Sequence, residues 1–441
     1  MMDWNRLISD KRLGLEQYHD PQHHTRSDFQ RDYDRLIFSS PFRRLQNKTQ
    51  VFPLPGSIFV HNRLTHSLEV SSVGRSMANE ATNILIDRHG YDIRTAKLRD
   101  MADIVATACL AHDLGNPPFG HNGEKTISSF FTEGAGLILK PLLTHHQWSD
   151  LANFEGNANS FRLLTHQFEG RRKGGYAMTY SALASVVKYP YPSTLAGKKG
   201  KFGYFETEEE IYLQVAEDLG IPEIEHGRHA RHPFVFLMEA ADDICYQIMD
   251  IEDSHKLKIL STEEVKTLLL NFFDERERIY MTDSMKRLDD PNEQVGYMRS
   301  KVIGALVGGC SKEFADHEKE ILAGDYNGSL VNNIAGRLSD AYAICSETAW
   351  KKIYNAPEVV DIELAGNRII TYLMENLVGA VVAPEKAYSR LLLEKVPRQY
   401  DVRSDNLSTR IQGVIDHVAA MTDVYALDLF RTLNGHSLPA V

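Results

Sequence analysis

Two imidazoles and a neighbouring carboxylate are the side chains of this sequence best suited to chemistry. His66 lies in the run RLTHSLEV, and His112 is followed directly by Asp113. A third run, ADDICY at residues 241–246, adds the carboxylates of Asp242 and Asp243. Imidazole nitrogens combined with carboxylate oxygens suit a hydrolytic divalent cation such as Mn²⁺, Mg²⁺ or Fe²⁺. The three runs therefore predict a metal site.

The surroundings of these residues decide between a metal site and ordinary core histidines. A single histidine on an apolar helix face is more often a satisfied core residue, and His66 alone would be interpreted in that way. His112 and Asp113, however, directly follow the apolar stretch 104–111. Ionisable groups at the end of such a helix are costly unless something binds them. Asp242 and Asp243 lie inside another apolar run, where unpaired buried carboxylates would also be costly, so a bound metal is favoured.

A second titratable pair follows the first turn. His121 and Glu124 are three residues apart, so on a helix that begins there they share a face. A carboxylate beside an imidazole orients it and raises its pKa, which produces an acid/base unit that works near neutral pH. The alternative is a charge pair at a helix N-terminus with no catalytic role. Its position soon after His112-Asp113 favours the catalytic interpretation.

The elements that must position these residues are mainly helices. Apolar residues recur at helical spacing along 64–84 and 104–111, and Pro233 opens a helix that carries Asp242. Four later stretches are also amphipathic: 265–273, 331–344, 369–378 and 407–420. Strand patterns are scarce, and the segments 50–52 and 57–60 could form one small hairpin. We expect an all-α fold with a catalytic core at 1–260 and a helical C-terminal region at 261–441 that completes the pocket and the subunit interfaces.

Composition limits the class of protein. The chain of 441 residues is 43% hydrophobic and 25% charged, as in a globular protein, and its net charge of −11 argues against a dedicated nucleic-acid coat. The four cysteines are far apart and predict reduced core thiols. No N-terminal apolar signal region is evident, and the apolar runs are far shorter than the ~20 residues of a membrane span. We therefore expect a cytoplasmic protein with no membrane contact.

Longer strings of the sequence are more specific than the metal-ligand pattern alone. Between residues 25 and 255, five runs resemble, in the same order, those of the deoxyguanosinetriphosphate triphosphohydrolase (dGTPase) family, which belongs to the HD superfamily of metal-dependent phosphohydrolases. These runs are 35–52, 62–70, 112–121 (HDLGNPPFGH), 154–158 (FEGNA) and 239–246 (EAADDICY). The rest of the chain resembles the family only as a helical continuation.

The resemblance implies hydrolysis of a deoxynucleoside triphosphate to the deoxynucleoside and intact triphosphate, with attack at the α-phosphorus. It makes His66, His112, Asp113 and Asp242 the metal ligands, and His121 with Glu124 the acid/base pair. Asp242 is preferred over Asp243 because Tyr246 and Asp250 follow it at four and eight residues, on one helix stripe. Asp243 points about a quarter-turn away.

The resemblance also implies a set of substrate contacts. Gln50 and Asp250 would read the 3′-hydroxyl, while close packing of Tyr246 would exclude a 2′-hydroxyl. Arg63 would reach the α-phosphate. The remaining predicted contacts are Asn116 and the triphosphate-binding run Lys188-Tyr189. The alternative for Lys188 is an ordinary surface lysine before a loop.

Other polar segments have simpler interpretations. Residues 226–232 (HGRHARH) predict a polar loop at a pocket rim or subunit contact rather than a second metal site, and residues 190–203 predict an exposed mobile loop. The basic runs 171–173 and 198–201 are expected to be solvated, although such islands could bind an effector.

Partners and alternative functions follow from the same resemblance. It implies a homo-oligomer, a hexamer in relatives, that responds to a dNTP or single-stranded DNA. One alternative function is an HD phosphohydrolase acting on another nucleotide. Another is a low-turnover nucleotide sensor or DNA-binding regulator, which an intact His121-Glu124 pair disfavours.

Overall fold

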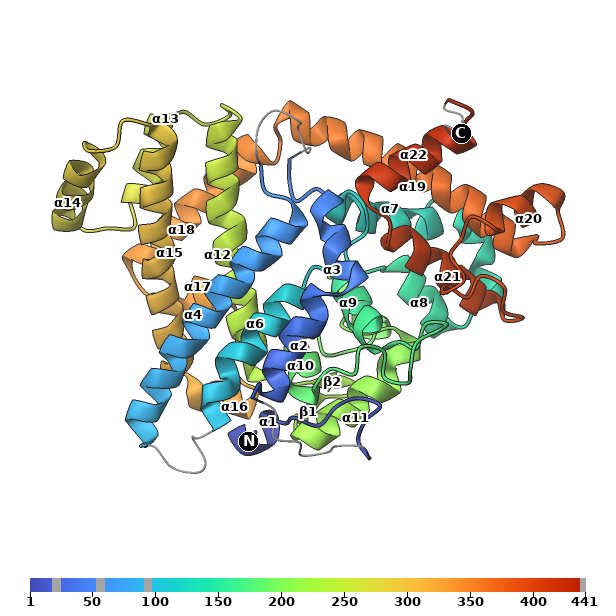
Figure 1. The fold of residues 1–441 in the computed structure, drawn as a ribbon, viewed down its shortest axis with the longest axis horizontal. Coiled ribbons are helices and arrows are strands. Elements are labelled where there is room, and N and C mark those ends of the chain that lie inside the picture. The colour runs from blue at the N-terminus through green and yellow to red at the C-terminus, as the bar shows by residue number, and fades with distance from the viewer. Residues whose placement is uncertain (18–24, 53–59, 91–96, 437–441) are drawn as a thin grey trace.

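Helices form almost all of the regular structure (Figure 1). The computed structural model describes residues 1–17, 25–52, 60–90 and 97–436. The main helices of the N-terminal part are α2 (Asp28–Ile37), α4 (Arg63–His89), α6 (Met101–Ala111), α7 (Gly120–Thr132), α8 (His145–Ala152), α9 (Gly156–Thr165), α10 (Tyr180–Val186), α11 (Glu209–Leu219) and α12 (Pro233–Lys256). Those of the C-terminal part are α13 (Thr262–Leu270), α14 (Glu275–Met285), α15 (Pro291–Asp316), α18 (Arg337–Thr348), α19 (Pro357–Val382), α20 (Ala387–Leu393), α21 (Leu407–Ala419) and α22 (Asp423–Leu433).

Shorter elements complete the chain. They are the short helices α1 (Trp4–Leu7), α3 (Ser40–Arg44), α16 (Glu318–Ala323) and α17 (Leu330–Asn333), together with the 3-10 and π turns η1 (Leu45–Asn47), η2 (Lys97–Asp100), η3 (Ala135–Leu142), η4 (Ser193–Leu195), η5 (Gly197–Lys199), η6 (Glu206–Glu208) and η7 (Ala349–Ile353). One two-stranded antiparallel sheet pairs β1 (Glu223–Glu225) with β2 (Arg228–His229). The prediction of a mainly helical fold is confirmed.

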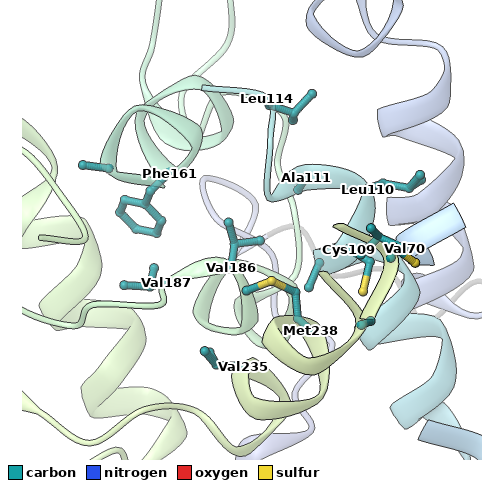
Figure 2. Packing of buried hydrophobic residues seen from close by; sticks show 14 of the residues in the cluster. Val70, Cys109, Leu110, Ala111, Leu114, Phe161, Val186, Val187, Val235 and Met238 are labelled. Atoms are coloured by element: carbon teal, nitrogen blue, oxygen red, sulfur yellow. The ribbon is translucent and has the colours of Figure 1, made fainter. Parts of the chain in front are cut away.

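The helices that carry the predicted metal ligands form the centre of the core. Helix α4 packs against α6, α12 and α15, and α12 also contacts α6 and α10. Every residue of α6 except Asp103 is buried, which accounts for its uninterrupted apolar run. Figure 2 shows this packing, with Cys109 and Leu110 of α6 near Val70 of α4 and Met238 of α12. The three ligand-bearing helices, α4, α6 and α12, therefore pack directly against one another.

Local sequence signals explain where these helices begin. Asn62 caps α4: its side chain accepts a hydrogen bond from the backbone N–H of Thr65, and the Thr65 hydroxyl accepts one from the backbone N–H of Asn62. Pro233 occupies the first turn of α12, as the sequence predicts, where its missing N–H costs nothing. His232 caps the same helix through its Nδ1, which accepts from Phe234 N–H at 3.2 Å.

The hairpin expected around residues 50–60 falls largely on residues 53–59, outside the described residues, and it stays a prediction. Three other predicted features differ from the structure. A small sheet lies in the polar segment 222–230, part of which the sequence predicts to be a loop, and Gly227 turns there at φ 74°. Residues 190–203 are not a fully exposed loop, because Phe202 is entirely buried. The stretch 331–344 is not one helix, since α17 ends at Asn333 and α18 begins at Arg337 after Gly336, whose φ is 79°.

The C-terminal helices pack on the N-terminal ones. Helix α12 contacts α13, α15 and α18, and α19 contacts α7. The division of the chain near residue 260 remains a prediction. Within the described part of the chain, no helix is both long and apolar enough to cross a membrane.

Candidate metal centre and its surroundings

His112 is oriented as a ligand by the end of its own helix. It caps α6, and its ring Nδ1 lies 2.6 Å from the carbonyl oxygen of Cys109. A carbonyl can only accept, so Nδ1 donates to it, and Nε2 is the ring nitrogen left to face the neighbouring carboxylates. Nε2 is buried and finds no hydrogen-bond partner among the described residues. A buried ring nitrogen in this position can bind a metal cation in place of a proton.

Three of the four predicted ligands converge. Asp242 Oδ1 lies 3.1 Å from His66 Nε2 and 3.4 Å from His112 Nε2. One ligand atom from each of the three residues lies within 4.8 Å of the others. Burial alone would lower the pKa of His112, but the carboxylates of Asp113 and Asp242 outweigh it and raise that pKa to about 9. The site thus attracts positive charge, and the residue types fit a divalent metal.

Asp113 adjoins this cluster but its oxygens have other partners. Oδ1 is 3.6 Å from His112 Nε2 and accepts a hydrogen bond from the Asn116 amide, while Oδ2 accepts one from Arg63 Nη1 at 2.6 Å. Burial would raise the pKa of Asp113, and the Arg63 guanidinium opposes it strongly enough to keep that pKa below its usual value. Arg63 and Asn116, both predicted substrate contacts, therefore hold the carboxylate of Asp113 beside the cluster.

The turn after Asp113 is packed too tightly for a side chain at Gly115. A Cβ at that position would lie 2.2 Å from the backbone of Gly156 and of Ser160 on α9. Ser160 also accepts from Gly115 N–H at 2.9 Å and donates to the His112 carbonyl oxygen at 2.9 Å. Close backbone approach explains the glycine in the HDLGN run, and it fixes the turn that separates His112 from α7.

The predicted acid/base pair forms on the first turn of α7. His121 Nδ1 lies 2.9 Å from Glu124 Oε2. Glu124 is buried, and its other oxygen accepts from Gly156 N–H at 2.9 Å, whereas the His121 side chain is 66% exposed. The charge of Glu124 and its hydrogen bond raise the pKa of His121. The buried carboxylate of Glu124 therefore orients the imidazole of His121, which is exposed to solvent.

Helix α12 continues from Asp242 as one stripe. Tyr246 and Asp250 follow at one-turn intervals, and the Tyr246 ring lies 5.9 Å from that of Tyr354. Tyr354 donates to Asp250 Oδ2 at 2.9 Å. Burial raises the pKa of Asp250 well above its ordinary value. Asp243 is outside the cluster: burial raises its pKa to about 7, and its backbone carbonyl accepts from Tyr342.

The other predicted substrate residues have distinct settings. Lys188 is partly buried and pairs with Glu239 Oε1 at 3.0 Å, so it is not an ordinary surface lysine. Tyr189 is half-buried beside it. Gln50 is half-buried, and its amide oxygen is buried without a hydrogen-bond partner among the described residues. No described contact joins Gln50 to Asp250.

Sequence reasoning missed four residues that contact the predicted set. Glu239 forms an ion pair with Lys188, and Tyr354 donates a hydrogen bond to Asp250. Lys201 forms ion pairs with Glu155 and Glu124. Asp423 accepts hydrogen bonds from the segments that carry Gln50 and His121. Glu239 lies in the EAADDICY run, and the buried Phe202 beside Lys201 was a signal against a solvated loop. Tyr354 and Asp423 stand in no recognisable motif.

Comparisons with known proteins agree with this geometry. The HD domain model matches residues 63–173, and the phosphohydrolase-associated domain model matches residues 335–432. The chain is 36% identical over 458 residues to a deoxyguanosinetriphosphate triphosphohydrolase-like protein of Synechocystis sp., which covers 99% of this chain and 100% of that protein. A protein of the same description from Pseudomonas aeruginosa is 36% identical over 455 residues, with 100% of both chains covered.

A more distant relative is named as the enzyme itself, without the suffix '-like'. It is the deoxyguanosinetriphosphate triphosphohydrolase of Yersinia enterocolitica, 29% identical over 486 residues that span 92% of this chain and 93% of that protein. The matched HD domain contains His66, His112 and Asp113, which supports a metal-binding role for the cluster. The chain therefore belongs to the deoxyguanosinetriphosphate triphosphohydrolase-like family of HD-domain phosphohydrolases.

Proposed function

We propose that the protein hydrolyses deoxynucleoside triphosphates, dGTP foremost, to the deoxynucleoside and intact inorganic triphosphate by attack at the α-phosphorus. One observation carries the proposal: three ligand atoms lie within 4.8 Å of one another, and the helix that supplies Asp242 continues into Tyr246 and Asp250. Helix α12 thereby carries both a metal ligand, Asp242, and the residues proposed to contact the sugar, Tyr246 and Asp250. The names of the relatives support the same substrate class.

The metal would be held by His66, His112 and Asp242, with Asp113 at its side. A bound Mn²⁺, Mg²⁺ or Fe²⁺ polarises a phosphoryl oxygen and lowers the pKa of a coordinated water. Arg63 supplies a buried positive charge beside Asp113 and faces the α-phosphate, where developing negative charge is strongest. Asn116 keeps Asp113 oriented through its amide.

His121 and Glu124 move the proton. Glu124 raises the pKa of His121 and so favours the protonated imidazole, whose exposed side chain can donate to the leaving 5′-oxygen or exchange a proton with the attacking water. Glu124 cannot rotate away because Gly156 N–H holds its second oxygen. Lys188, with the Tyr189 ring beside it, supplies positive charge for the triphosphate.

Sugar selection uses Tyr246 and Asp250 of α12 together with Gln50. Asp250 and the unpartnered amide of Gln50 recognise the 3′-hydroxyl, and Tyr246, packed on Tyr354, leaves no space for a 2′-hydroxyl. An HD phosphohydrolase that acts on another nucleotide would not need these sugar-contacting residues. A sensor with little turnover would not need the supported His121.

The test is product analysis. Pure protein incubated with dGTP and Mn²⁺ or Mg²⁺ should release deoxyguanosine and triphosphate, and GTP should be a much poorer substrate. Release of dGMP with pyrophosphate, or of inorganic phosphate, would contradict the proposed mechanism. Equal rates with dGTP and GTP would contradict the sugar assignment. A panel of the four dNTPs decides the base preference.

Assembly is part of the proposal. Large apolar side chains are exposed on η3 and the C-terminal helices, among them Ile138, Leu364 and Leu391. Such surfaces support packing between copies of the chain, a hexamer in the proposed state, with a dNTP or single-stranded DNA as effector. Light scattering with and without added nucleotide measures the mass of the assembly.

A further inference from the structure

Glu239 stands between two cations beside the candidate metal centre. Its Oε1 lies 3.0 Å from Lys188 Nζ and its Oε2 lies 2.9 Å from Arg231 Nη1. The carboxylate is 7% exposed, and it precedes Asp242 by one turn of α12. Both oxygens are thus used to neutralise side chains from two separate loops.

These residues line a cavity of about 600 Å³. Its described lining contains six lysine or arginine side chains and a single carboxylate, that of Glu239. The six cations are Lys188, Lys198, Lys199, Lys201, Arg228 and Arg231. In a chain whose net charge is −11, this concentration of positive charge is local and specific.

Two of these cations, Arg228 and Arg231, are held in place before any ligand binds. The Arg228 guanidinium lies 4.0 Å from the centre of the Tyr191 ring and donates to the Leu195 carbonyl oxygen. Arg231 lies 5.4 Å from the centre of the Phe236 ring. Positioned guanidiniums lose little freedom when they bind phosphate oxygens. Cations distributed along one cavity match a linear polyphosphate better than a single orthophosphate.

We propose that Glu239 is a built-in competing anion in this cavity: it pairs with Lys188, which the proposed function already assigns to the triphosphate, and with Arg231, and it limits how tightly the inorganic triphosphate product is retained. The inference rests on the proposed function, which makes triphosphate the product. Triphosphate must replace Glu239 at Lys188 and Arg231. Its apparent affinity is therefore reduced by the fraction of molecules in which Glu239 occupies them. Glu239 thus favours product release without contacting the reacting phosphorus.

The experiment is calorimetric titration of sodium tripolyphosphate into the full-length protein, without divalent cations in the titrant, since these chelate the ligand. Glu239→Gln should lower the Kd about fivefold or more, and Arg231→Gln should raise it by a similar factor. The matched control is Lys286→Gln. Lys286 is exposed, directly follows α14 and pairs only with Asp283 among the described residues, so the Kd of this variant should equal that of the unmodified protein. Orthophosphate should bind weakly to all four proteins.

Other outcomes overturn the inference. An unchanged or raised Kd in Glu239→Gln would remove the competing role of the carboxylate, and an unchanged Kd in Arg231→Gln would remove the cavity as the binding site. Because Glu239 is buried, its variant is checked by thermal unfolding; if it does not fold, Arg231→Gln, whose side chain is 26% exposed, carries the test. Product analysis is separate: release of dGMP would contradict the proposed function while leaving these Kd shifts measurable.

Discussion

Asp423 Oδ1 accepts a hydrogen bond at 2.9 Å from the backbone N–H of Phe119, the residue that begins the helix carrying His121. Its Oδ2 accepts two more, from the backbone N–H and the hydroxyl of Thr49, at 2.7 and 2.5 Å. Thr49 directly precedes Gln50. One carboxylate from α22 therefore fixes both the predicted acid/base helix and the predicted sugar-reading segment.

Helix α19 strengthens the same attachment. Asn122 donates to the Glu363 carbonyl oxygen at 2.7 Å, and a Cβ at Gly366 would lie 2.7 Å from Cγ of the Phe119 ring. Phe119 itself has φ 62°, in the left-handed region that non-glycine residues seldom adopt. Its unusual conformation is supported by contacts from both C-terminal helices. The C-terminal region thus positions α7 directly.

Replacing Asp423 by alanine should lower kcat about 10- to 100-fold while metal content stays unchanged. Two backbone N–H groups lose their acceptor at a buried site, which costs about 1–3 kcal/mol each and releases Phe119 and Thr49. Steady-state kinetics with dGTP and metal analysis by mass spectrometry measure the two effects. Asp428→Ala, an exposed position on the same helix, is the control. Activity within twofold of the unmodified protein in Asp423→Ala would show that Asp423 does not position α7.

Removal of a predicted metal ligand should abolish both metal binding and activity. Asp242→Asn and His112→Ala each take one donor from the cluster, and we expect at least about a hundredfold loss of metal affinity, since even loss of an outer partner costs about 10- to 100-fold. The neighbouring Asp243→Asn should keep its metal because Asp243 lies outside the cluster. Dialysis followed by elemental analysis measures this. Metal retained in Asp242→Asn and lost in Asp243→Asn would reverse the ligand assignment.

The pH dependence of kcat should reflect the pKa of His121, which Glu124 raises. Because Glu124 raises the pKa of His121, the imidazole stays protonated to higher pH than an isolated histidine. Activity that needs this proton falls as pH rises through the raised pKa. Glu124→Gln removes the charge, so the alkaline limb should move to lower pH. Glu133→Gln, exposed at the end of α7, is the control. An unmoved alkaline limb in Glu124→Gln would exclude His121 as the group that titrates.

The parts of the site that could be predicted are those encoded at short range. Helical periodicity and the adjacency of His112 and Asp113 predict the ends of α4 and α6 to within a few residues. The one-turn steps from Asp242 to Tyr246 and from Tyr246 to Asp250 distinguish Asp242 from Asp243. Asn62 and Pro233 mark the starts of α4 and α12 through local effects confined to the first helical turn. Signals of this kind are visible in a single sequence.

The parts that could not be predicted depend on long-range contacts. Tyr354 meets Asp250 across 104 residues, and Asp423 meets Thr49 across 374. Neither residue lies in a pattern that differs from an ordinary helical surface. The hairpin of β1 and β2 was missed for another reason: its exposed, charged residues lack the alternation that marks a half-buried strand.

His61 should make stability depend on pH in the alkaline range. Its Nδ1 lies 2.8 Å from Asp253 Oδ2 on α12 and its Nε2 lies 3.1 Å from Glu69 Oε1 on α4. Burial opposes the charged form, yet the hydrogen bonds and charges of Asp253 and Glu69 raise the pKa of His61 to about 10, from about 6.5 in the unfolded chain. The charged imidazole thus joins the two helices that carry His66 and Asp242.

Since the folded-state pKa is raised, this contribution is fully present below about pH 6.5 and is lost as pH rises towards about 10. Denaturant unfolding at pH 6.5 and 9.5 should show that the unmodified protein loses on the order of a few kcal/mol more than His61→Gln does over this interval. His89→Gln changes an exposed residue at the C-terminal end of α4, which pairs with Glu318 of α16, and this variant should follow the unmodified protein because His89 is exposed. Parallel curves for the unmodified protein and His61→Gln would mean that the link between α4 and α12 does not depend on the charge of this imidazole.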